Sequence, residues 1–209
     1  MSTTRPFELN GIIPPGVPHK ILGGPLPDVN YANRYAIRYL AFTPNGRIGV
    51  SYPWPDVPKH RLPGGFIDGL AGLDKAVEVE FFFSTGGRVT PRGALKARPD
   101  GSGESDFVLD PPVATSEEWQ SVEKVGVRQI TLCFLADFSL ETGDPEEVTD
   151  AELRANGRVR LGQMGVDEAR EAIAGEKSET PVAKVIRERD LWFLELGLEV
   201  EGKRKAGGE

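Results

Sequence analysis

The 209-residue chain is poor in the residues from which disulfides and metal centres are usually built. It has one cysteine, Cys133, and two histidines, His19 and His60. A single cysteine excludes an internal disulfide and a cysteine-only zinc site. Two histidines exclude a multi-histidine metal centre, and a Ser-His-Asp triad would need one of the two.

Long apolar runs and an excess of positive charge are also missing. The chain has no run of about 18 apolar residues, which argues against a transmembrane helix. The N-terminal sequence MSTTRPFELNG lacks the apolar core of a signal peptide, so we expect a cytoplasmic protein. The net charge of −7 argues against nucleic-acid binding, which depends on clustered lysine and arginine. We therefore expect neither a nucleic acid nor a membrane as partner, although a local basic pocket could hold a small phosphorylated ligand.

Composition and length match an ordinary globular protein. Hydrophobic residues make up 39% of the chain and charged residues 27%, which suits one domain with extensions. Proline and glycine concentrate in residues 1–33, which we interpret as an irregular arm, either docked or loose, before a domain at 34–198. We expect residues 96–124 to be a largely flexible insertion in that domain and residues 199–209 to be a disordered tail.

The residue pattern predicts both strands and helices. Asn45-Gly46 between the apolar runs 34–43 and 47–52 is a strong hairpin signal. Further strands are predicted at 88–95, 127–138 and 158–161, and helices at 73–84, 166–175 and 181–196.

Residues 127–138 alternate with the period of a half-buried strand. The side chains predicted to share the apolar face are Ile130, Leu132, Phe134, Ala136 and Phe138. Cys133 falls on the other face with Gln129, Thr131 and Asp137. Because no histidine is near Cys133 in sequence, we expect it to be a packing residue rather than a nucleophile.

Residues 62–89, LPGGFIDGLAGLDKAVEVEFFFSTGGRV, carry the most informative motif. This stretch resembles the Nudix box, G-x5-E-x7-R-E-U-x-E-E-x-G-U with U a bulky aliphatic residue, and aligns with it without a gap. Gly65 takes the first glycine, Glu80 the glutamate of the Arg-Glu pair, Phe81 the bulky position and Gly86 the closing glycine. The lead-in Leu62-Pro63-Gly64-Gly65 and a terminal helix with Arg189-Asp190-Leu191 also fit. The resemblance implies an α/β fold, a Nudix-like α/β/α sandwich with a mixed, curved sheet between helices.

The departures from the box concern the metal site that the resemblance implies. The family glutamates and arginine fall here on Ala71, Val79, Phe83 and Ser84. In the family, the glutamates line one helix face and bind Mg²⁺ or Mn²⁺, which bridge a diphosphate and activate water. Positions 80, 83 and 84 lie within one helical turn, so three carboxylates there could share a metal. One carboxylate, Glu80, does not hold a hard divalent ion well.

The candidate site residues lie in and just before the box. Glu80 and His60 are the candidates for acid–base catalysis. The candidates for ligand binding are Trp54, Gly64, Gly65, Asp68, Val79 and Phe83. Each has a plainer alternative: Glu80 could be an inherited residue paired with a basic side chain, His60 a surface residue, and Trp54 a loop anchor packed on the sheet.

Three functions follow from these residues. The chain could be a metal-independent enzyme acting on a mostly apolar small molecule, or a non-catalytic binder. The alternative is a Mg²⁺-dependent Nudix hydrolase of nucleoside diphosphate-linked substrates that uses non-standard ligands, with loop acids rebuilding the metal site. We favour loss of the family chemistry, with no cofactor and no metal ligands, Mg²⁺ or Mn²⁺ entering only under the alternative. We expect a small-molecule ligand, largely apolar, as partner, and the sequence is compatible with a homodimer.

Overall fold

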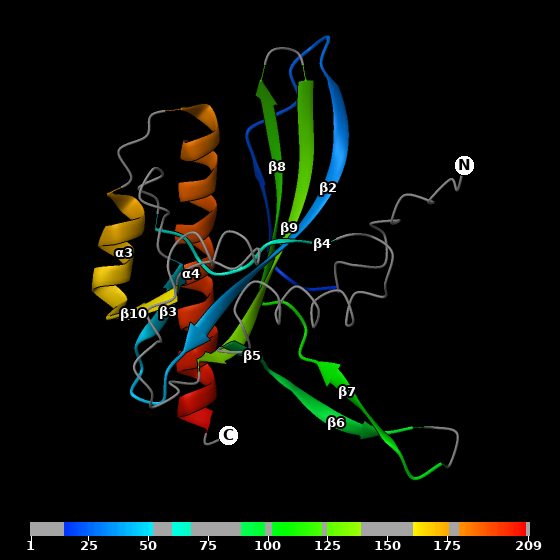
Figure 1. Ribbon diagram of the computed structural model, residues 1–209, viewed down its shortest axis with the longest axis vertical. Coiled ribbons are helices and arrows are strands. Elements are labelled where there is room, and N and C mark those ends of the chain that lie inside the picture. Colours follow the sequence, from blue (N-terminus) through cyan, green and yellow to red (C-terminus); the bar gives the residue numbers. More distant parts are fainter. Residues whose placement is uncertain are drawn as a thin grey trace, which may run out of the picture.

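The fold is built on one large mixed sheet. The computed structural model describes residues 15–51, 60–67, 89–98, 102–122, 125–138, 161–175 and 180–207. In chain order the elements are β1 (His19–Leu22), β2 (Asn30–Phe42), β3 (Ile48–Ser51), β4 (Phe66–Ile67), β5 (Val89–Pro91), β6 (Gly93–Ala97), β7 (Ser105–Leu109), β8 (Ala114–Val122), β9 (Val125–Phe138), β10 (Leu161–Met164), α3 (Val166–Ala174) and α4 (Pro181–Gly207). The large sheet has eight strands in the order β1-β8-β9-β2-β3-β10, with β4 beside β2 and β5 beside β9 (Figure 1).

The two longest strands form the centre of this sheet. β2 and β9 run parallel from Asn30 opposite Val125 to Phe42 opposite Asp137. β1 is also parallel to β8, whereas β8 with β9, β2 with β3 and β3 with β10 are antiparallel. β2 curves along its length (Figure 1). The predicted α/β class with a mixed, curved sheet is confirmed.

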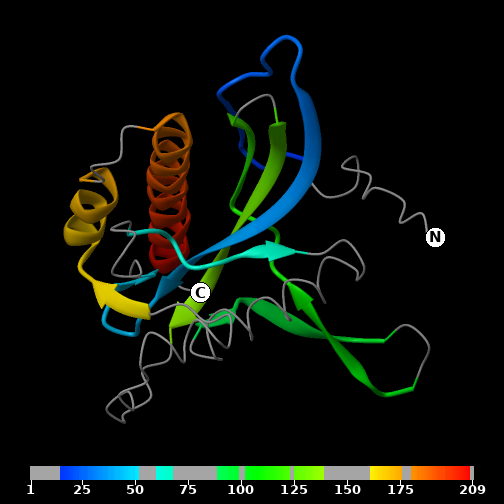
Figure 2. The ribbon, with the colours of Figure 1, turned by 45° about the horizontal axis from the view of Figure 1, so that its top comes forward.

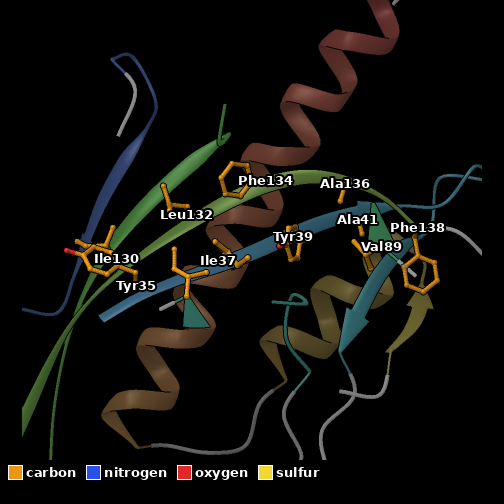
Figure 3. Packing of buried hydrophobic residues seen from close by; sticks show 11 residues of the cluster. Tyr35, Ile37, Tyr39, Ala41, Val89, Ile130, Leu132, Phe134, Ala136 and Phe138 are labelled. Carbon is orange, nitrogen blue, oxygen red and sulfur yellow. The ribbon is translucent and has the colours of Figure 1, made fainter. Parts of the chain in front are cut away.

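One face of the central strands forms an apolar cluster. It contains alternate residues of β2 and β9, shown as sticks in Figure 3, and Ile67 and Val89 join it from β4 and β5. The β9 members are Ile130, Leu132, Phe134, Ala136 and Phe138. The apolar alternation predicted for residues 127–138 is confirmed.

The opposite face of the same strands is buried as well. Leu40 of β2 packs there with Phe193 and Leu194 of α4 and with Ile173 of α3. The side chains of Gln129 and Thr131 in β9, predicted to lie on the open face of a half-buried strand, are at most 3% exposed. That prediction is wrong because α4 packs on this face.

Both described helices lie on this one face of the sheet (Figures 1 and 2). α3 confirms the helix predicted at 166–175, and β10 follows the strand predicted at 158–161 by a few residues. The helix predicted at 73–84 lies outside the described residues. Within the described parts of the chain, no helix is long and apolar enough to cross a membrane.

The Asn45-Gly46 hairpin is confirmed between β2 and β3. Phe42 pairs with Ile48, and the Thr43 N–H donates to the Arg47 carbonyl at 2.9 Å. Of the two turn residues, Asn45 and Gly46, only Gly46 has a positive φ, of 78°. Glycine adopts this conformation without steric cost, which fixes the turn at this residue.

Residues 19–22, which the sequence placed in an irregular arm, form an edge strand of the sheet. β1 pairs with β8, and the Thr115 N–H donates to the Pro18 carbonyl at 2.9 Å. Leu22 is buried, and β2 begins at Asn30 rather than at residue 34. These residues are docked, one of the two alternatives for the arm, but they are regular rather than irregular because the prolines flank the run His19–Leu22 without interrupting it.

The insertion predicted at 96–124 as largely flexible is mostly strand in its described part. β6 and β7 form a separate antiparallel pair, and β8 joins the main sheet beside β9. The Trp119 ring on β8 meets the Tyr31 ring edge-on, with 4.8 Å between their centroids, and Glu117 accepts two hydrogen bonds from Arg128. The composition misled because β8 is held by polar and aromatic contacts rather than by an aliphatic face.

The C-terminal tail predicted to be disordered from residue 199 is helical to Gly207. Glu201 is buried and accepts hydrogen bonds from Arg92 at 2.5 Å and from Arg204 at 3.2 Å. Lys203 pairs with Glu199 one turn before it. The charged residues at the end of α4 continue the helix because most of them form ion pairs, and composition alone does not show which charges are paired.

Candidate functional site

The lead-in of the box, residues 60–67, runs beside β2. The Tyr39 N–H donates to the Pro63 carbonyl at 2.8 Å and the Ile37 N–H to the Gly65 carbonyl at 2.9 Å. β4 then continues as an antiparallel neighbour of β2. Main-chain hydrogen bonds therefore fix the lead-in against the centre of the sheet.

Gly64 lies where no other residue fits without movement of the backbone. Its φ is 142°, a conformation that side chains with a Cβ rarely adopt. A Cβ at Gly64 would lie 2.2 Å from the Ile37 carbonyl oxygen and 2.9 Å from the Arg38 Cα. The structure thus assigns Gly64 a role in backbone approach, while the ligand contacts predicted for Gly64 and Gly65 stay predictions.

A small pocket opens beside the lead-in, between residues 60–61, α3 and α4. The residues that line it are His60, Arg61, Ile173, Ala183, Ile186, Arg187 and Asp190. The apolar members come from the two helices, and the polar members come from the lead-in and from α4. This arrangement brings His60, the predicted acid–base candidate, next to ionisable groups of α4.

Asp190 connects α4 to the lead-in. One carboxylate oxygen accepts a hydrogen bond from the Leu62 N–H at 3.1 Å, and the other accepts one from Arg189 Nε at 2.7 Å. The Asp190 side chain is fully buried. Both oxygens are held, so Asp190 serves to position the start of Leu62-Pro63-Gly64-Gly65.

A buried ion pair joins α4 to β8. Arg189 Nη1 lies 3.0 Å from a carboxylate oxygen of Glu118, and both side chains are at most 1% exposed. Glu118 also accepts hydrogen bonds from Ser116 at 2.8 Å, Thr131 at 2.7 Å and Gln129 at 3.0 Å. The Glu118 carboxylate has its acceptor sites occupied, which suits a structural group rather than one that takes up a proton from a substrate.

Arg38 of β2 supplies the fourth charge of this buried cluster. Burial lowers the pKa of the Arg38 guanidinium to about 10, and Arg189 adds to the effect, while Asp190 and Glu118 oppose it. Arg38 Nη1 donates to the Ile37 carbonyl at 2.7 Å, and Nε has no hydrogen-bond partner in the described structure. The two arginines, Arg38 and Arg189, balance the two carboxylates, Glu118 and Asp190, so this buried cluster carries no net charge.

Cys133 is a packing residue, as predicted. It lies in the apolar cluster beneath α4 and is fully buried. Burial raises the pKa of the Cys133 thiol, and the charge of Asp190 raises it further. A buried thiol with a raised pKa is a poor nucleophile.

Sequence reasoning missed Glu118 and Arg38 and valued Arg189-Asp190 only for its place in the family resemblance. On a helix at 100° per residue, Arg189 and Asp190 fall on the same face as Ile186 and Phe193. Two adjacent charges on an apolar face predict buried partners, so this signal was available. Glu118 stands among polar neighbours in β8 and gave no such signal.

Most of the predicted site lies outside the described residues. These residues are Trp54, Asp68, Val79, Glu80 and Phe83, together with the replaced box positions Ala71 and Ser84. The structure brings His60, Gly64 and Gly65 together on the lead-in. Among the residues it describes, no group of three or more histidine, cysteine, aspartate or glutamate side chains could hold a metal ion.

Comparisons with known proteins find similarity among solved structures alone. No protein-family model and no curated protein matches it. Among solved structures it matches the E. coli ORF135 protein over 87% of this chain and 98% of that one, at 13% identity and a TM-score of 0.42. It matches a Nudix-family hydrolase from Clostridium perfringens over 79% and 98%, at 14% identity and a TM-score of 0.40. A MutT Nudix hydrolase from Burkholderia pseudomallei matches over 75% and 97%, at 20% identity and a TM-score of 0.37. Two of these three structures are Nudix hydrolases, and at 13 to 20% identity the likeness concerns the fold alone.

Proposed function

We propose that this chain is a Nudix-like protein that binds a small, largely apolar molecule and lacks metal-dependent diphosphate hydrolysis. The observation that carries the proposal is the residues at the box positions. Ala71, Phe83 and Ser84 stand where the family has glutamates, and Val79 stands where it has arginine. Glu80 is the one carboxylate left among these positions.

The chemistry of the divalent ion supports this proposal. Mg²⁺ takes oxygen ligands in near-octahedral geometry and needs carboxylates to hold it against water. If residues 73–84 form the helix that the sequence predicts, Val79, Glu80 and Phe83 share a face that offers one carboxylate between two apolar side chains. The same face suits an apolar ligand, with Trp54 available to stack on a flat ring and Asp68 available to approach Glu80 from the loop.

One observation favours catalysis over binding alone. His60 lies beside α4 in a pocket of about 10 Å³, which has room for one water molecule, and histidine is the side chain best suited to proton transfer near neutral pH. A metal-independent enzyme on this fold would use His60 or Glu80 as its acid–base group. The second candidate function is therefore metal-independent conversion of the apolar ligand.

The first test measures the metal chemistry directly. We expect isothermal titration of the full chain with Mn²⁺ to give no binding, and a panel of nucleoside diphosphate-linked compounds with Mg²⁺ to give no hydrolysis. The variant Glu80→Gln should behave as wild type, as should its control Glu78→Gln. Micromolar Mn²⁺ binding together with hydrolysis that is lost in Glu80→Gln but kept in Glu78→Gln would refute the proposal, and would mean that other carboxylates rebuild the site.

A second test addresses Phe83, one of the residues predicted to bind the ligand. The fluorescent probe 1-anilinonaphthalene-8-sulfonate should bind the folded wild type and bind at least about tenfold more weakly to Phe83→Glu, because a carboxylate there opposes both burial and the probe's sulfonate. Equal binding to both proteins would remove Phe83 from the ligand site. Any compound found to bind is then assayed for turnover with wild type and His60→Asn, which separates the enzyme from the binder.

A further inference from the structure

A buried network of hydrogen bonds joins β8 to the lead-in through α4. Glu118 of β8 accepts a hydrogen bond from Arg189 Nη1 at 3.0 Å, and Arg189 Nε donates to Asp190 at 2.7 Å. The other carboxylate oxygen of Asp190 accepts the Leu62 N–H at 3.1 Å. All four residues are at most 1% exposed. Bulk water does not reach these bonds, so each one fixes the group that follows it.

Leu62 is the point at which the lead-in passes from one strand to another. Before it, the Arg61 carbonyl accepts a hydrogen bond from β3 at 2.9 Å, and after it, the Pro63 carbonyl accepts one from β2 at 2.8 Å. Pro63 has no N–H, so Leu62 supplies the one main-chain donor between these two carbonyls. A buried N–H without an acceptor costs free energy, and Asp190 takes the place of a strand partner here.

Arg189 holds the Asp190 carboxylate in the orientation that reaches Leu62. An aspartate side chain can turn about two bonds, and Arg189 binds the oxygen that Leu62 does not use. Arg38, the other buried arginine, donates to the Ile37 carbonyl and to neither carboxylate in the described structure. Arg189 is therefore the arginine that joins the two carboxylates.

Glu118 is the fixed end of this network. Its carboxylate accepts hydrogen bonds from side chains of β8 and β9, which are Ser116 at 2.8 Å, Thr131 at 2.7 Å and Gln129 at 3.0 Å. Two strands of the sheet thus hold the carboxylate with which Arg189 pairs. The sheet sets the place of Arg189, and Arg189 sets that of the carboxylate on the lead-in.

We infer that Glu118 and Arg189 are positioning residues for the lead-in and for the candidate ligand site on it. They act through Asp190, and neither is among the residues that line the pocket beside His60. His60 lies two residues before Leu62, and the glycine pair of the lead-in follows it, so a displaced Leu62 moves both. The inference rests on the proposed function, since these positions matter to a ligand only if that site binds one.

The test measures hydrogen exchange of single amides in the folded full chain by NMR. Arg189→Lys keeps the charge but has no planar fork with which to hold two carboxylates. We expect its Leu62 amide to exchange at least about tenfold faster relative to the amides of the central β2–β9 pair, which report on global unfolding. Destabilisation of the whole fold would accelerate the central amides at least as much. Arg170→Lys is the control, because Arg170 bridges Asp167 and Glu195 on the surface, and it should leave Leu62 exchange unchanged.

A second variant keeps the test decisive if circular dichroism shows that Arg189→Lys does not fold. Thr131→Val removes one hydrogen bond to Glu118 and alters no residue of α4 or of the lead-in. Its Leu62 amide should exchange at least about threefold faster relative to the central amides. Thr115→Val is the matched control, since Thr115 is equally buried but bonds to His19 instead of Glu118. Leu62 exchange that only follows the central amides in the folded variants overturns the inference.

Ligand binding separates this inference from the proposed function. If wild type binds 1-anilinonaphthalene-8-sulfonate, Arg189→Lys should bind it about threefold or more weakly, and Arg170→Lys should bind it as wild type does. Equal binding by Arg189→Lys with a fast Leu62 amide would mean that the lead-in does not shape the ligand site, and would overturn the inference. A wild type that binds no probe counts against the proposed function alone, and amide exchange then decides whether Glu118 and Arg189 position the lead-in.

Discussion

At the scale of single residues, Gly64 is a position where the backbone leaves no room for a side chain. Replacing it with alanine places a Cβ 2.2 Å from the Ile37 carbonyl oxygen and forces a φ of 142° on a residue that avoids it. We predict that Gly64→Ala lowers the free energy of unfolding by about 2 kcal/mol or more, measured by urea denaturation.

Gly16→Ala is the matched control for this prediction. Gly16 also has a positive φ, of 86°, but a Cβ there meets nothing within 4 Å. It should lose only the conformational part, about 1 kcal/mol. Equal losses in the two variants would show that the close approach of Gly64 to β2 has no energetic weight.

Glu118 balances the buried arginines of the cluster beneath α4. Glu118→Gln keeps the size of the side chain but removes its charge, so Arg189 and Arg38 are left with one carboxylate, Asp190. Removing one partner of a buried ion pair costs about 3 to 5 kcal/mol. We predict a loss of this order in chemical denaturation of Glu118→Gln.

The control for Glu118→Gln is a surface ion pair. Glu188 pairs with Lys20 at 2.8 Å, and its side chain is 57% exposed. Glu188→Gln should change stability by less than about 1 kcal/mol, because exposed pairs are screened by water and salt. If Glu118→Gln were as mild as Glu188→Gln, the buried cluster could not be what holds α4 to β8.

These residues also show how far the sequence could predict the site. The sequence singled out Gly64 and Gly65 by their motif, but it predicted ligand contacts for them and not the close approach of Gly64 to the β2 backbone. The hydrogen bond of Asp190 with Leu62 could not be predicted. Leu62 lies 128 positions away in sequence, and it contributes a main-chain N–H, which does not depend on the identity of its side chain. Long-range pairing of this kind depends on strand order, which the sequence of one chain does not encode locally.

At the scale of elements, the end of α4 is held by charge, so its stability depends on pH. Burial raises the pKa of the Glu201 carboxyl, but hydrogen bonds from Arg204 and Arg92 outweigh it and lower the pKa to about 2. A pKa below the ordinary value of 4.5 means that Glu201 stabilises the fold fully above pH 4.5 and loses this effect as the pH falls toward 2.

The measurement is thermal unfolding of wild type and Glu201→Gln between pH 7 and pH 2. Wild type should be the more stable protein at pH 7, and the difference should shrink below pH 4.5. A difference that stays constant over this range would mean that the Glu201 charge does not hold the helix end. Glu199→Gln, one turn earlier and paired with Lys203 on the surface, provides the control.

The elements that the sequence predicted best are those with an apolar period of their own. The strand at 127–138 and the helix at 166–175 repeat apolar residues at the spacing of their structure, and both are present. β8 and the end of α4 were missed because polar contacts hold them, with Glu117 on Arg128 and Glu201 on Arg92. Composition predicts solvation for such segments when their partners are unknown.

At the scale of the whole molecule, two large apolar clusters, one on either face of the sheet, hold the described fold together. One packs alternate residues of β2 and β9, and the other packs β2, α3 and α4. A fold stabilised in this way can keep its architecture while the residues at a ligand face change. Function therefore has to be argued from the residues of the site.

The start of the chain closes one edge of this sheet, and its removal tests that role. Deleting residues 1–24 removes β1, with the buried Leu22 and the hydrogen bond from Thr115 to Pro18, and exposes the edge of β8. The loss of about 2 to 3 kcal/mol of burial and pairing should lower the melting temperature by about 5 to 10 °C. An uncovered strand edge should also make the shortened chain aggregate, visible as light scattering during heating. Deleting residues 1–14 leaves β1 in place and serves as the control. If the two shortened chains melted and scattered alike, β1 would contribute nothing to the sheet, and residues 15–24 would behave as a loose arm rather than a docked one.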